Sequence, residues 1–591
     1  MEKNAITERA KDYIKKEKDA GFRAEVEKLL ADSGEEAYKE LEDRFYRNLE
    51  FGTGGLRGII GGGYNRMNTL VVKSATQGLA NYILKTLQDK SDLSAPADLS
   101  VPADLSAAIA FDSRHYSAEF AEAAALIFAA NGIKTYLFSA MRPTPELSFA
   151  IRRLGCNTGL VITASHNPPK YNGYKAYWND GSQVISPHDK GIIAEVNSVE
   201  DIKEMPREEA LKKGLLCIID KEIDEPYRAM VKSKLFRPDL LKEKAREVKV
   251  VYTPLHGTGA MHVEGILGEF GLKVITVPEQ REGNGDFPTV EFPNPEEAPA
   301  LDLAIKLGLK EGADVVMATD PDADRFGIAV LDSHKKNFIL VTGNQMGVLV
   351  ADYIFLSRKE FGKMPRNPLM ITTVVSTGMM KRIAASYGVN CVECLTGFKW
   401  IADIMRKCDS GEIDGTFVYG TEESYGYLIE NEVRDKDGIS VAALTAEMTL
   451  YWRSKGKSLL ERLNELYTEH GYWEEFGISK YFQGPEGPGI MNGIMESYRK
   501  NPPSSLGGLS VMRIRDLKEG VDGLPQSDVL QFFLADGTIV SARPSGTEPK
   551  IKFYATCCTE VKNAGGLEAA KQEAGTKLKA IEKDIRSVIG K

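Results

Sequence analysis

The feature that most constrains the fold of this chain is the alternation of short apolar segments with helical segments. AAIAF (107–111) and KTYLF (134–138) have the length and composition of buried strands, and an Ala-rich helical segment at 117–131 separates them. A further helical stretch precedes another expected strand, GLVI at 159–162. Strands separated by helices are typical of βαβ units on a parallel sheet. This part of the chain is therefore predicted to form an α/β domain.

The same alternation occurs twice more before the pattern changes. The second set of expected strands lies at 248–254, 272–277 and 313–319, and the third at 337–343, 368–375 and 415–420. From about residue 505, the segments LSVMRIRDL, VLQFFLADGTIVSARPS and IKFYATC are predicted to form an antiparallel sheet with a closing helix at 566–588. We predict three similar α/β domains and a smaller C-terminal α+β domain, with boundaries at 1–232, 233–335, 336–475 and 476–591.

Three segments stand outside this alternation. Residues 1–50 contain no proline, are rich in Glu, Lys and Ala, and are predicted to be amphipathic helix. The glycine-rich segment FGTGGLRG (51–58), which continues to Gly61–Gly63, is expected to be a flexible loop that brings backbone amides close to a ligand. The degenerate repeat APADLS–VPADLS at 95–106 is predicted to be a surface insertion, and we assign it no function.

Composition and charge narrow the class of protein. Hydrophobic residues make up 42% of the 591 residues and charged residues 27%, which is typical of a folded chain. The apolar runs are far shorter than the roughly 20 residues that span a bilayer, and the charged first 20 residues lack the core of a secretory signal. We therefore expect a cytoplasmic protein without a membrane partner. The net charge of −9 disfavours nucleic acid as a partner but leaves room for a small anionic substrate.

Four polar segments follow predicted strands or lie in a sheet-to-loop turn, where ligand groups gather in α/β domains. The first is Thr163-Ala-Ser-His-Asn-Pro168, after the strand at 159–162. Ser165 beside His166 is the pattern of an activated nucleophile, and an ordinary turn rich in Ser and Thr is the equally weighted alternative. The nearby segment NGYK is expected to add a turn and to place Lys175 as a base or a phosphate contact.

The second segment is Asp320-Pro-Asp-Ala-Asp-Arg325, directly after the strand at 313–319. Three carboxylates at alternate positions are costly so close together unless a divalent cation neutralises them. Oxygen ligands favour a hard ion such as Mg²⁺. The alternative is a solvated acidic turn, which the position at the end of a strand argues against.

The third and fourth segments suit sugar and phosphate. GTEESYG (420–426) offers adjacent carboxylates and a hydroxyl that can bond sugar hydroxyls, or it begins a helix. RPSGTEPK (543–550) combines an Arg, two hydroxyls and a Gly, which favours a phosphate-binding turn over a plain one. Gly and Pro residues near 480–505 are expected to form a linker or hinge.

Together and in this order, the four segments resemble those of the α-D-phosphohexomutase superfamily. They resemble its phosphoserine loop, metal loop, sugar-specificity loop and phosphate-binding loop, respectively. FGTGGLRG, LTGFKWI (395–401) and RDKDGIS (434–440) also resemble family segments. The long N-terminal helix, NGYKAYW and TGFKW look most like the phosphoglucomutase-2/phosphopentomutase branch. Thr421 stands where related loops have Gly, and the loop lacks the His of the phosphomannomutase type.

The resemblance implies four domains around a central active-site cleft and a phosphoryl-transfer mechanism. Phosphorylated Ser165 would donate its phosphoryl group to a sugar monophosphate, and the bisphosphate intermediate would return its other phosphate. Mg²⁺ would be bound by Asp320, Asp322, Asp324 and the phosphoserine at 165, and glucose 1,6-bisphosphate would act as activator. Arg325 would stabilise charge, and His166 and Lys175 would handle protons, with Lys175 favoured. The implied substrate-binding residues are Arg57, Thr396, Lys399, Glu422, Ser424, Lys436, Arg543, Ser545, Gly546 and Thr547.

Several alternatives stay open at this point. Among mutases, hexose 1-phosphate, pentose 1-phosphate and mannose phosphate are candidate substrates. A bias toward synthesis of glucose 1,6-bisphosphate is an alternative activity. From other classes, a Mg²⁺-dependent sugar-phosphate phosphatase or a non-catalytic sugar-phosphate sensor would share part of this pattern. The sequence does not indicate an oligomeric state.

Overall fold

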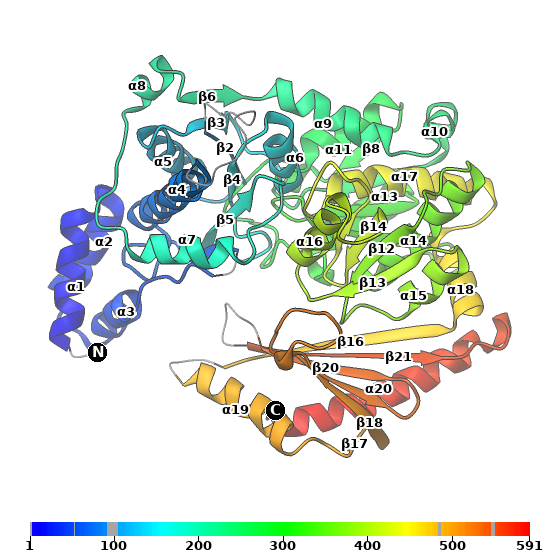
Figure 1. Ribbon diagram of the computed structural model, residues 1–591. Helices are drawn as coiled ribbons and strands as arrows, with labels where there is room; N and C mark the ends of the chain where they lie inside the picture. Colours follow the sequence, from blue (N-terminus) through cyan, green and yellow to red (C-terminus); the bar gives the residue numbers. More distant parts are fainter. Residues whose placement is uncertain (1–2, 53, 92–104, 483–485, 545–549, 591) are drawn as a thin grey trace. The chain divides into compact units, whose positions relative to one another are not determined.

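The computed structural model (Figure 1) describes the chain except for residues 1–2, 53, 92–104, 483–485, 545–549 and 591. Most of the repeat at 95–106, and the predicted site residues Ser545, Gly546 and Thr547, therefore lie outside the described residues. The chain divides into two compact units, Met1–Ala329 with Leu428–Glu447, and Val330–Tyr427 with Met448–Lys591. Leu428–Glu447 thus clusters with the first unit, although it falls within the third predicted domain.

The first sheet has six strands in the order β1-β5-β4-β2-β3-β6. Its parallel strands are β2 (Ser106–Phe111), β3 (Lys134–Phe138), β4 (Thr158–Ile162) and β6 (Leu216–Ile219). Every residue of β2 and β4 is buried, which explains their nearly continuous apolar sequences. Helices α4 (Thr69–Ser91) and α5 (Ser117–Ala130) lie on one face of this sheet, and α6 (Thr144–Leu154) lies on the other (Figure 1).

Two segments predicted as a loop and a turn are strands of this sheet. β1 (Gly55–Ile59) pairs antiparallel with β5 (Tyr171–Trp178), so the expectations of a flexible loop at 55–58 and of a turn at 172–175 were wrong. Glycine at position 173 is what permits the pairing. A Cβ there would lie 2.5 Å from the Thr163 carbonyl oxygen and 2.9 Å from that of Leu56. Glycine in this segment therefore allows close approach of neighbouring strands rather than mobility.

The N-terminal residues form the predicted helices, α1 (Lys3–Lys16), α2 (Ala20–Ala31) and α3 (Glu35–Phe45). They enclose a small core of their own, made of Ile6, Ala10, Tyr13, Val26, Leu41 and Phe45. The glycines at 61–63 pack against these helices. The Gly62 amide donates to the Glu25 carboxylate at 3.0 Å, and a Cβ at Gly62 would lie 2.3 Å from the Phe22 carbonyl oxygen.

The second sheet has the strand order β11-β10-β9-β7-β8. Its strands are β7 (Val250–Thr253), β8 (Val274–Thr276), β9 (Val315–Thr319), β10 (Phe326–Asp332) and β11 (Asn337–Val341). Strand β10 was not predicted, and the division between the two units falls inside it. The helices of this region are α9 (Lys221–Ser233), α10 (Pro238–Lys244), α11 (Ala260–Glu269), α12 (Pro278–Arg281) and α13 (Asp302–Glu311).

The third sheet has the order β13-β12-β14-β15 and lies in the second unit up to Tyr427. Its strands are β12 (Pro368–Thr373), β13 (Asn390–Cys394), β14 (Thr416–Glu422) and β15 (Gly426–Leu428). Both α14 (Gly343–Glu360) and α16 (Phe398–Asp409) pack against β14, and α15 (Met379–Ser386) packs against β13. Two helices follow this sheet, α17 (Gly438–Ser454) and α18 (Leu459–His470).

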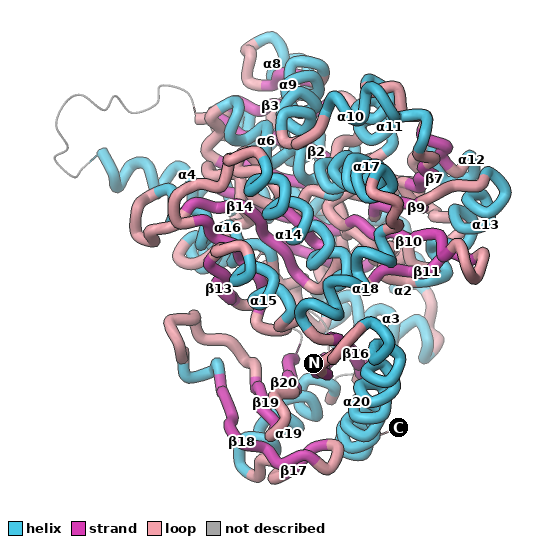
Figure 2. The backbone as a smooth tube through the Cα atoms, turned by 90° about the vertical axis from the view of Figure 1, so that its right-hand side faces the viewer, coloured by secondary structure: helices cyan, strands magenta, loops and turns pink. Residues whose placement is uncertain are grey.

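The C-terminal sheet is antiparallel, with the order β16-β21-β20-β19-β18-β17. Its strands are β16 (Tyr472–Tyr481), β17 (Ser505–Leu506), β18 (Leu509–Asp516), β19 (Leu530–Leu534), β20 (Ile539–Pro544) and β21 (Lys550–Thr559). Helices α19 (Gly487–Lys500) and α20 (Leu567–Ile589) lie along one face (Figures 1 and 2). Residues 487–500 are therefore helix, not the expected linker. Since β16 crosses the boundary predicted between 475 and 476, we propose that this domain begins at Tyr472.

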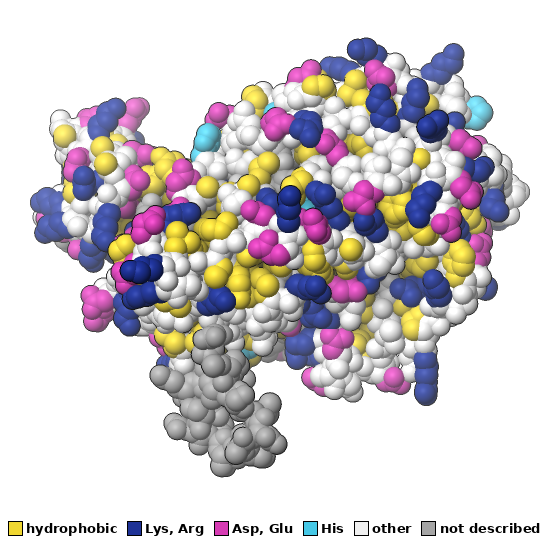
Figure 3. Space-filling view, turned by 90° about the horizontal axis from the view of Figure 1, so that it is seen from above, with side chains coloured by type: hydrophobic (Ala, Val, Ile, Leu, Met, Phe, Trp, Pro, Cys, Tyr) yellow, Lys and Arg dark blue, Asp and Glu magenta, His cyan; other side chains and the backbone are white. Residues whose placement is uncertain are grey.

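The predicted fold class is confirmed: three α/β domains and a smaller C-terminal α+β domain. Within the second unit, the third and fourth domains share an apolar cluster made of Val374, Val375, Leu395, Leu517 and Val529. No helix in the described part of the chain is long and apolar enough to cross a membrane. On the face shown in Figure 3, Lys and Arg side chains are interspersed with Asp and Glu, and apolar side chains are exposed between them.

Replacing Gly62 by Ala tests whether this glycine is required for docking of the N-terminal helices. The new methyl group would overlap the Phe22 carbonyl and the Val26 side chain, so we expect a loss of about 1–3 kcal/mol of stability. Thermal unfolding and limited proteolysis between residues 46 and 50 measure the effect. Gly268→Ala is the matched control, because nothing lies within 4 Å of its Cβ position. Equal melting of the two variants would contradict the role assigned to Gly62.

Candidate active site

Ser165 lies in the loop after β4, in contact with the acidic loop after β9. Its Oγ donates a hydrogen bond to Asp320 Oδ2 at 2.6 Å and lies 3.1 Å from His166 Nδ1. Its backbone has a φ of 52°, in the left-handed region that a non-glycine residue rarely adopts. Such strain is often found at functional sites, where the surrounding structure holds it in place. The structure thus joins two of the four predicted segments at one point.

The acidic loop brings its three carboxylates together. Asp320, Asp322 and Asp324 are at most 1% exposed, and one oxygen from each lies within 4.8 Å of the others. A turn closes between them, since the Ala323 amide donates to the Asp320 carbonyl and Ala323 has a φ of 52°. This reversal of the chain lets alternate side chains converge on one point. The solvated acidic turn considered as an alternative is excluded by the burial.

Two lysines balance part of this buried negative charge. Lys175 Nζ from β5 lies 2.7 Å from Asp322 Oδ2 and 3.3 Å from Asp324 Oδ2. Lys436 Nζ lies 3.2 Å from Asp324 Oδ2 and 3.1 Å from Asp435 Oδ1. Lys436, predicted with the sugar-binding residues, therefore contacts the acidic loop.

The carboxylates differ in their affinity for protons. Burial, reinforced by the charges of Asp322 and Asp324, holds the pKa of Asp320 well above its usual range. Burial alone would also raise the pKa of Asp322, but the charge and hydrogen bond of Lys175 lower it below the usual value. Burial would lower the pKa of Lys175, yet the charges of Asp322 and Asp324 raise it. Lys175 is therefore an ammonium ion at neutral pH.

The donor set of this cluster fits a hard divalent cation. Asp322 Oδ1 and Asp324 Oδ1 are buried and have no hydrogen-bond partner among the described residues. Unsatisfied buried carboxylate oxygens are costly, and a cation is the group that would satisfy both. Ligands that are all oxygen favour Mg²⁺ over softer metals. Asp320, Asp322 and Asp324 are thus the residues that would hold such an ion.

Two predicted arginines lie at the edge of this cluster. The Arg325 amide donates to Asp320 Oδ1 at 3.0 Å, and its guanidinium forms an ion pair with Glu296. Arg57 of β1 donates from Nη1 to Asn167 Oδ1 at 3.2 Å, one residue beyond His166. The first unit therefore brings together Ser165, His166, Lys175, the acidic loop with Arg325, Arg57 and Lys436.

Sequence reasoning missed residues that contact the predicted ones and hold them in place. Thr144, the first residue of α6, donates from Oγ1 to Asp322 Oδ2 and from its amide to the Asp322 carbonyl, both at 2.9 Å. Asp435 accepts a hydrogen bond from the Tyr177 hydroxyl at 2.7 Å in addition to contacting Lys436. Glu296 holds Arg325, as described above. A signal for Thr144 was present, since it follows β3 at the same edge of the sheet as the Ser165 loop.

The remaining predicted residues belong to the second unit. Thr396 precedes α16, Lys399 lies in its first turn, and Glu422 ends β14. Ser424 lies in the turn after β14 and donates to Glu423 Oε1 at 3.2 Å. Glu423 Oε2 in turn accepts from Thr373 Oγ1 at 2.9 Å, which ties this turn to the end of β12. Arg543 lies in β20, paired with Lys552 of β21.

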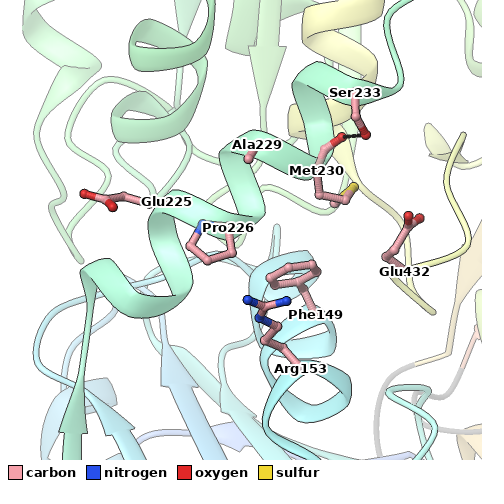
Figure 4. Close-up of a pocket in the computed structure, with 8 residues that line it drawn as sticks. All are labelled: Phe149, Arg153, Glu225, Pro226, Ala229, Met230, Ser233 and Glu432. Atoms are coloured by element: carbon pink, nitrogen blue, oxygen red, sulfur yellow. Dashed lines mark hydrogen bonds between the residues drawn. The ribbon is translucent and has the colours of Figure 1, made fainter.

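A hollow of about 620 Å³ lies elsewhere in the first unit, between α6 and α9. Phe149 and Arg153 project from α6 toward α9 (Figure 4). Met230 and Glu432 lie on the side of the hollow away from Glu225. Among the residues that the structure describes, no predicted site residue lines this hollow. The hollow is therefore distinct from the Ser165 cluster.

Comparison with known proteins identifies the family of this chain. Models described as phosphoglucomutase/phosphomannomutase alpha/beta/alpha domains I, II and III match residues 48–203, 225–333 and 342–470, and the C-terminal domain model matches 499–571. The chain is 35% identical over 581 residues to a probable phosphoribomutase of Schizosaccharomyces pombe, with 93% of each covered. It is 34% identical over 529 residues to a phosphoglucomutase of Staphylococcus haemolyticus, covering 87% of this chain and 91% of the relative.

A solved structure shows the same fold. The exocytosis-sensitive phosphoprotein parafusin, a phosphoglucomutase from Paramecium, superposes with a TM-score of 0.67 at 19% identity, covering 92% of this chain and 95% of that chain.

Asp322→Asn tests the acidic cluster as a cation site. The change removes a charged oxygen ligand while keeping the shape of the side chain, so we expect Mn²⁺, used as a spectroscopic substitute for Mg²⁺, to bind at least about 10-fold more weakly. Titration of the metal-free protein followed by electron paramagnetic resonance measures this affinity without any assay of activity. Asp201→Asn, at an exposed position, controls for the change in net charge. Equal affinity in the two variants would show that the cluster is not the metal site.

Proposed function

Because the chain belongs to the phosphoglucomutase/phosphomannomutase family and is a phosphosugar mutase, we propose that Ser165 carries the phosphoryl group in its reaction. The group would move between the 1- and 6-positions of a hexose, or between the 1- and 5-positions of a pentose, through a bisphosphate intermediate. The observation that carries this proposal is the 2.6 Å hydrogen bond between Ser165 Oγ and Asp320, inside a buried cluster suited to a cation.

The cluster supplies what phosphoryl transfer requires of a protein. The transferring group carries negative charge on its outer oxygens, so catalysis rests mainly on positioning and charge neutralisation. Mg²⁺ bound by Asp320, Asp322 and Asp324 would neutralise part of that charge. Lys175 keeps its positive charge next to the same carboxylates because they raise its pKa. A phosphoryl group on Ser165 Oγ would therefore enter a site whose opposing charges are already in place.

Proton transfer at Ser165 is proposed to involve His166. When the phosphoryl group leaves, Ser165 Oγ must gain a proton, and when the group returns, it must lose one. His166 Nδ1, at 3.1 Å, is within hydrogen-bond reach of that oxygen. Lys175, which the sequence favoured for proton transfer, is proposed instead to act mainly as a fixed charge, since it is held by Asp322 and Asp324. Arg325 would add charge beside Asp320.

The sugar and its second phosphate are proposed to be bound by residues of the second unit. The sugar would be contacted by Thr396, Lys399, Glu422 and Ser424. These residues lie at or after the ends of strands or at the start of a helix, where the residues that bind substrate gather in α/β domains. Arg543 would bind the non-transferring phosphate through a charge-assisted contact, with Ser545, Gly546 and Thr547 completing the motif. Sugar phosphates are thus the proposed ligands, and glucose 1,6-bisphosphate the proposed activator.

Glucose 1-phosphate and ribose 1-phosphate are the proposed substrates. Relatives named phosphoribomutase and phosphoglucomutase match this chain at nearly equal identity, 35% and 34%. Mannose phosphate is less favoured, because Glu423-Ser424-Tyr425 lacks the His of the phosphomannomutase type. Net synthesis of glucose 1,6-bisphosphate is the alternative within the family, and hydrolysis of a sugar phosphate is the alternative outside it.

Ser165→Ala should abolish the phosphorylated form of the enzyme. After incubation with glucose 1,6-bisphosphate, intact-mass measurement should find one added phosphoryl group on the wild type and none on the variant. Mutase activity should fall roughly 10³-fold or more, as expected when a covalent nucleophile is removed. Ser198→Ala, at an exposed position, should behave as the wild type. Release of inorganic phosphate by the wild type, without isomerised product, would instead establish a phosphatase.

A panel of sugar 1-phosphates tests the proposed specificity. Glucose 1-phosphate and ribose 1-phosphate should each give a kcat/KM at least about 10-fold above that of mannose 1-phosphate, because discrimination between sugars rests on hydrogen bonds to their hydroxyls. Coupled assays with Mg²⁺ and a constant concentration of bisphosphate provide the three values. A preference for mannose 1-phosphate would contradict the placement in the phosphopentomutase branch.

A further inference from the structure

Arg114 is a buried arginine that binds the loop carrying Ser165. It lies in the turn between β2 and α5, and its side chain is 0% exposed. Nη1 donates to the carbonyl oxygens of Pro168 and Tyr171 at 2.9 and 3.0 Å. Nη2 donates to those of Ser165, at 2.5 Å, and Asn167. One guanidinium thus holds four carbonyl oxygens spread over residues 165–171.

A second arm of the same turn holds the Ser165 amide. Asp112 Oδ2 accepts a hydrogen bond from Thr163 Oγ1 at 2.5 Å, and Thr163 Oγ1 accepts one from the Ser165 amide at 2.7 Å. Asp112 is itself fixed, because Oδ1 accepts from the Arg114 amide at 3.0 Å and from Ser117 Oγ at 2.8 Å. The turn therefore fixes Ser165 from both sides, through its amide and through its carbonyl.

The loop sequence explains why an arginine is needed. Pro168 and Pro169 lack an amide proton, so the loop has more carbonyl acceptors than amide donors. An arginine guanidinium offers five donors in a planar fork and no acceptor. Buried carbonyls without a partner are costly, and Arg114 supplies the missing donors. Its positive charge is balanced by Asp112, whose Oδ2 lies 3.4 Å from Arg114 Nε.

The same contacts set the direction of the Ser165 peptide groups. Ser165 has its strained φ of 52° between the two anchored groups, its amide and its carbonyl. Because a trans peptide points its N–H opposite to its carbonyl, the bond to Arg114 turns the His166 amide away from the guanidinium. Ser165 Oγ reaches Asp320 from this fixed backbone. Loss of the hydrogen bond to the Ser165 carbonyl, or of the one from the Ser165 amide, would let the backbone relax and move the Oγ.

We propose that the Asp112–Arg114 turn positions the phosphoserine loop for phosphoryl transfer, with Arg114 as its principal positioning residue. This inference rests on the proposed function of Ser165 and assigns a role to residues that do not touch the substrate. A reacting atom displaced by about 1 Å can cost about 10²-fold in rate. The turn should therefore act on kcat rather than on substrate binding.

The principal test is Arg114→Lys. Lysine keeps the charge but replaces the planar fork by a single ammonium group, which cannot hold four carbonyl oxygens in place. We expect kcat to fall roughly 30–100-fold while KM changes less than about 3-fold. Hydrogen exchange followed by mass spectrometry should show faster exchange of the segment 163–172, with other segments of the first unit unchanged. This second readout needs no substrate.

Arg462→Lys is the matched control. Arg462 is a buried arginine of the second unit that binds both carboxylate oxygens of Asp352 at 2.9 Å, and it lies outside the proposed site. The Arg462→Lys variant should have a lower melting temperature than the wild type and an unchanged kcat. If Arg114→Lys does not fold, Thr163→Val replaces it. This change removes the hydrogen bonds of the Thr163 hydroxyl to Asp112 and the Ser165 amide at nearly constant volume. It should also lower kcat at unchanged KM.

The outcomes separate this inference from the function on which it rests. Wild-type protein that gains no phosphoryl group from glucose 1,6-bisphosphate would overturn the proposed function and this inference with it. If the wild type is phosphorylated and a folded Arg114→Lys variant has the same kcat as Arg462→Lys, the inference alone is overturned. Unchanged exchange at 163–172 in that variant would overturn it as well.

Discussion

The buried negative charge of Asp320, Asp322 and Asp324 is the constraint on which the first unit depends. Three carboxylates within contact of one another repel, and burial removes the water that would screen them. Two lysines supply positive charge. Lys175 Nζ, from the first sheet, lies 2.7 Å from Asp322, and Lys436 Nζ, from the segment Leu428–Glu447, lies 3.2 Å from Asp324. The acidic loop is therefore held in this arrangement partly by β5 and partly by the segment around residue 436. Residues far apart in the sequence thus stabilise one cluster.

This dependence explains why Leu428–Glu447 clusters with the first unit. Asp435 accepts from Tyr177 and Asp437 accepts from Tyr227, each at 2.7 Å, and both hydroxyls are buried. Burial, together with the charges of Asp435 and Asp437, holds the pKa of these tyrosines well above the usual value, so each remains a hydrogen-bond donor. Periodicity along the chain reports local structure only, and it gave no sign of these long-range bonds.

The sequence predicted the central strands and the clustering of Ser165 with the acidic loop better than the edge strands and the residues that hold this cluster. Strands β2 and β4 are buried on both faces, so their sequences are continuous apolar runs that could be identified. Strand β1 contains glycines and β13 is only partly buried, and both were missed. Ser165 and the acidic loop stood out because they combine reactive groups after a strand. Arg114 also follows a strand, but it binds carbonyl oxygens of a loop more than 50 residues away, and the sequence does not show which distant backbone groups an arginine will bind.

In the proposed mechanism, the two units divide the work: the first holds the reacting groups and the second binds the sugar. Ser165, proposed to carry the phosphoryl group, belongs to the first unit, as do the proposed cation ligands and the lysines beside them. Buried hydrogen bonds and ion pairs within that unit hold these residues. The residues proposed to bind the sugar, from Thr396 to Ser424, belong to the second. Substitutions in the second unit can therefore change which sugar phosphate binds without disturbing the balance of charge around Ser165. If the proposed roles hold, the fold and the charged cluster can stay constant while specificity changes, because function resides in sites carried by a fold rather than in the fold itself.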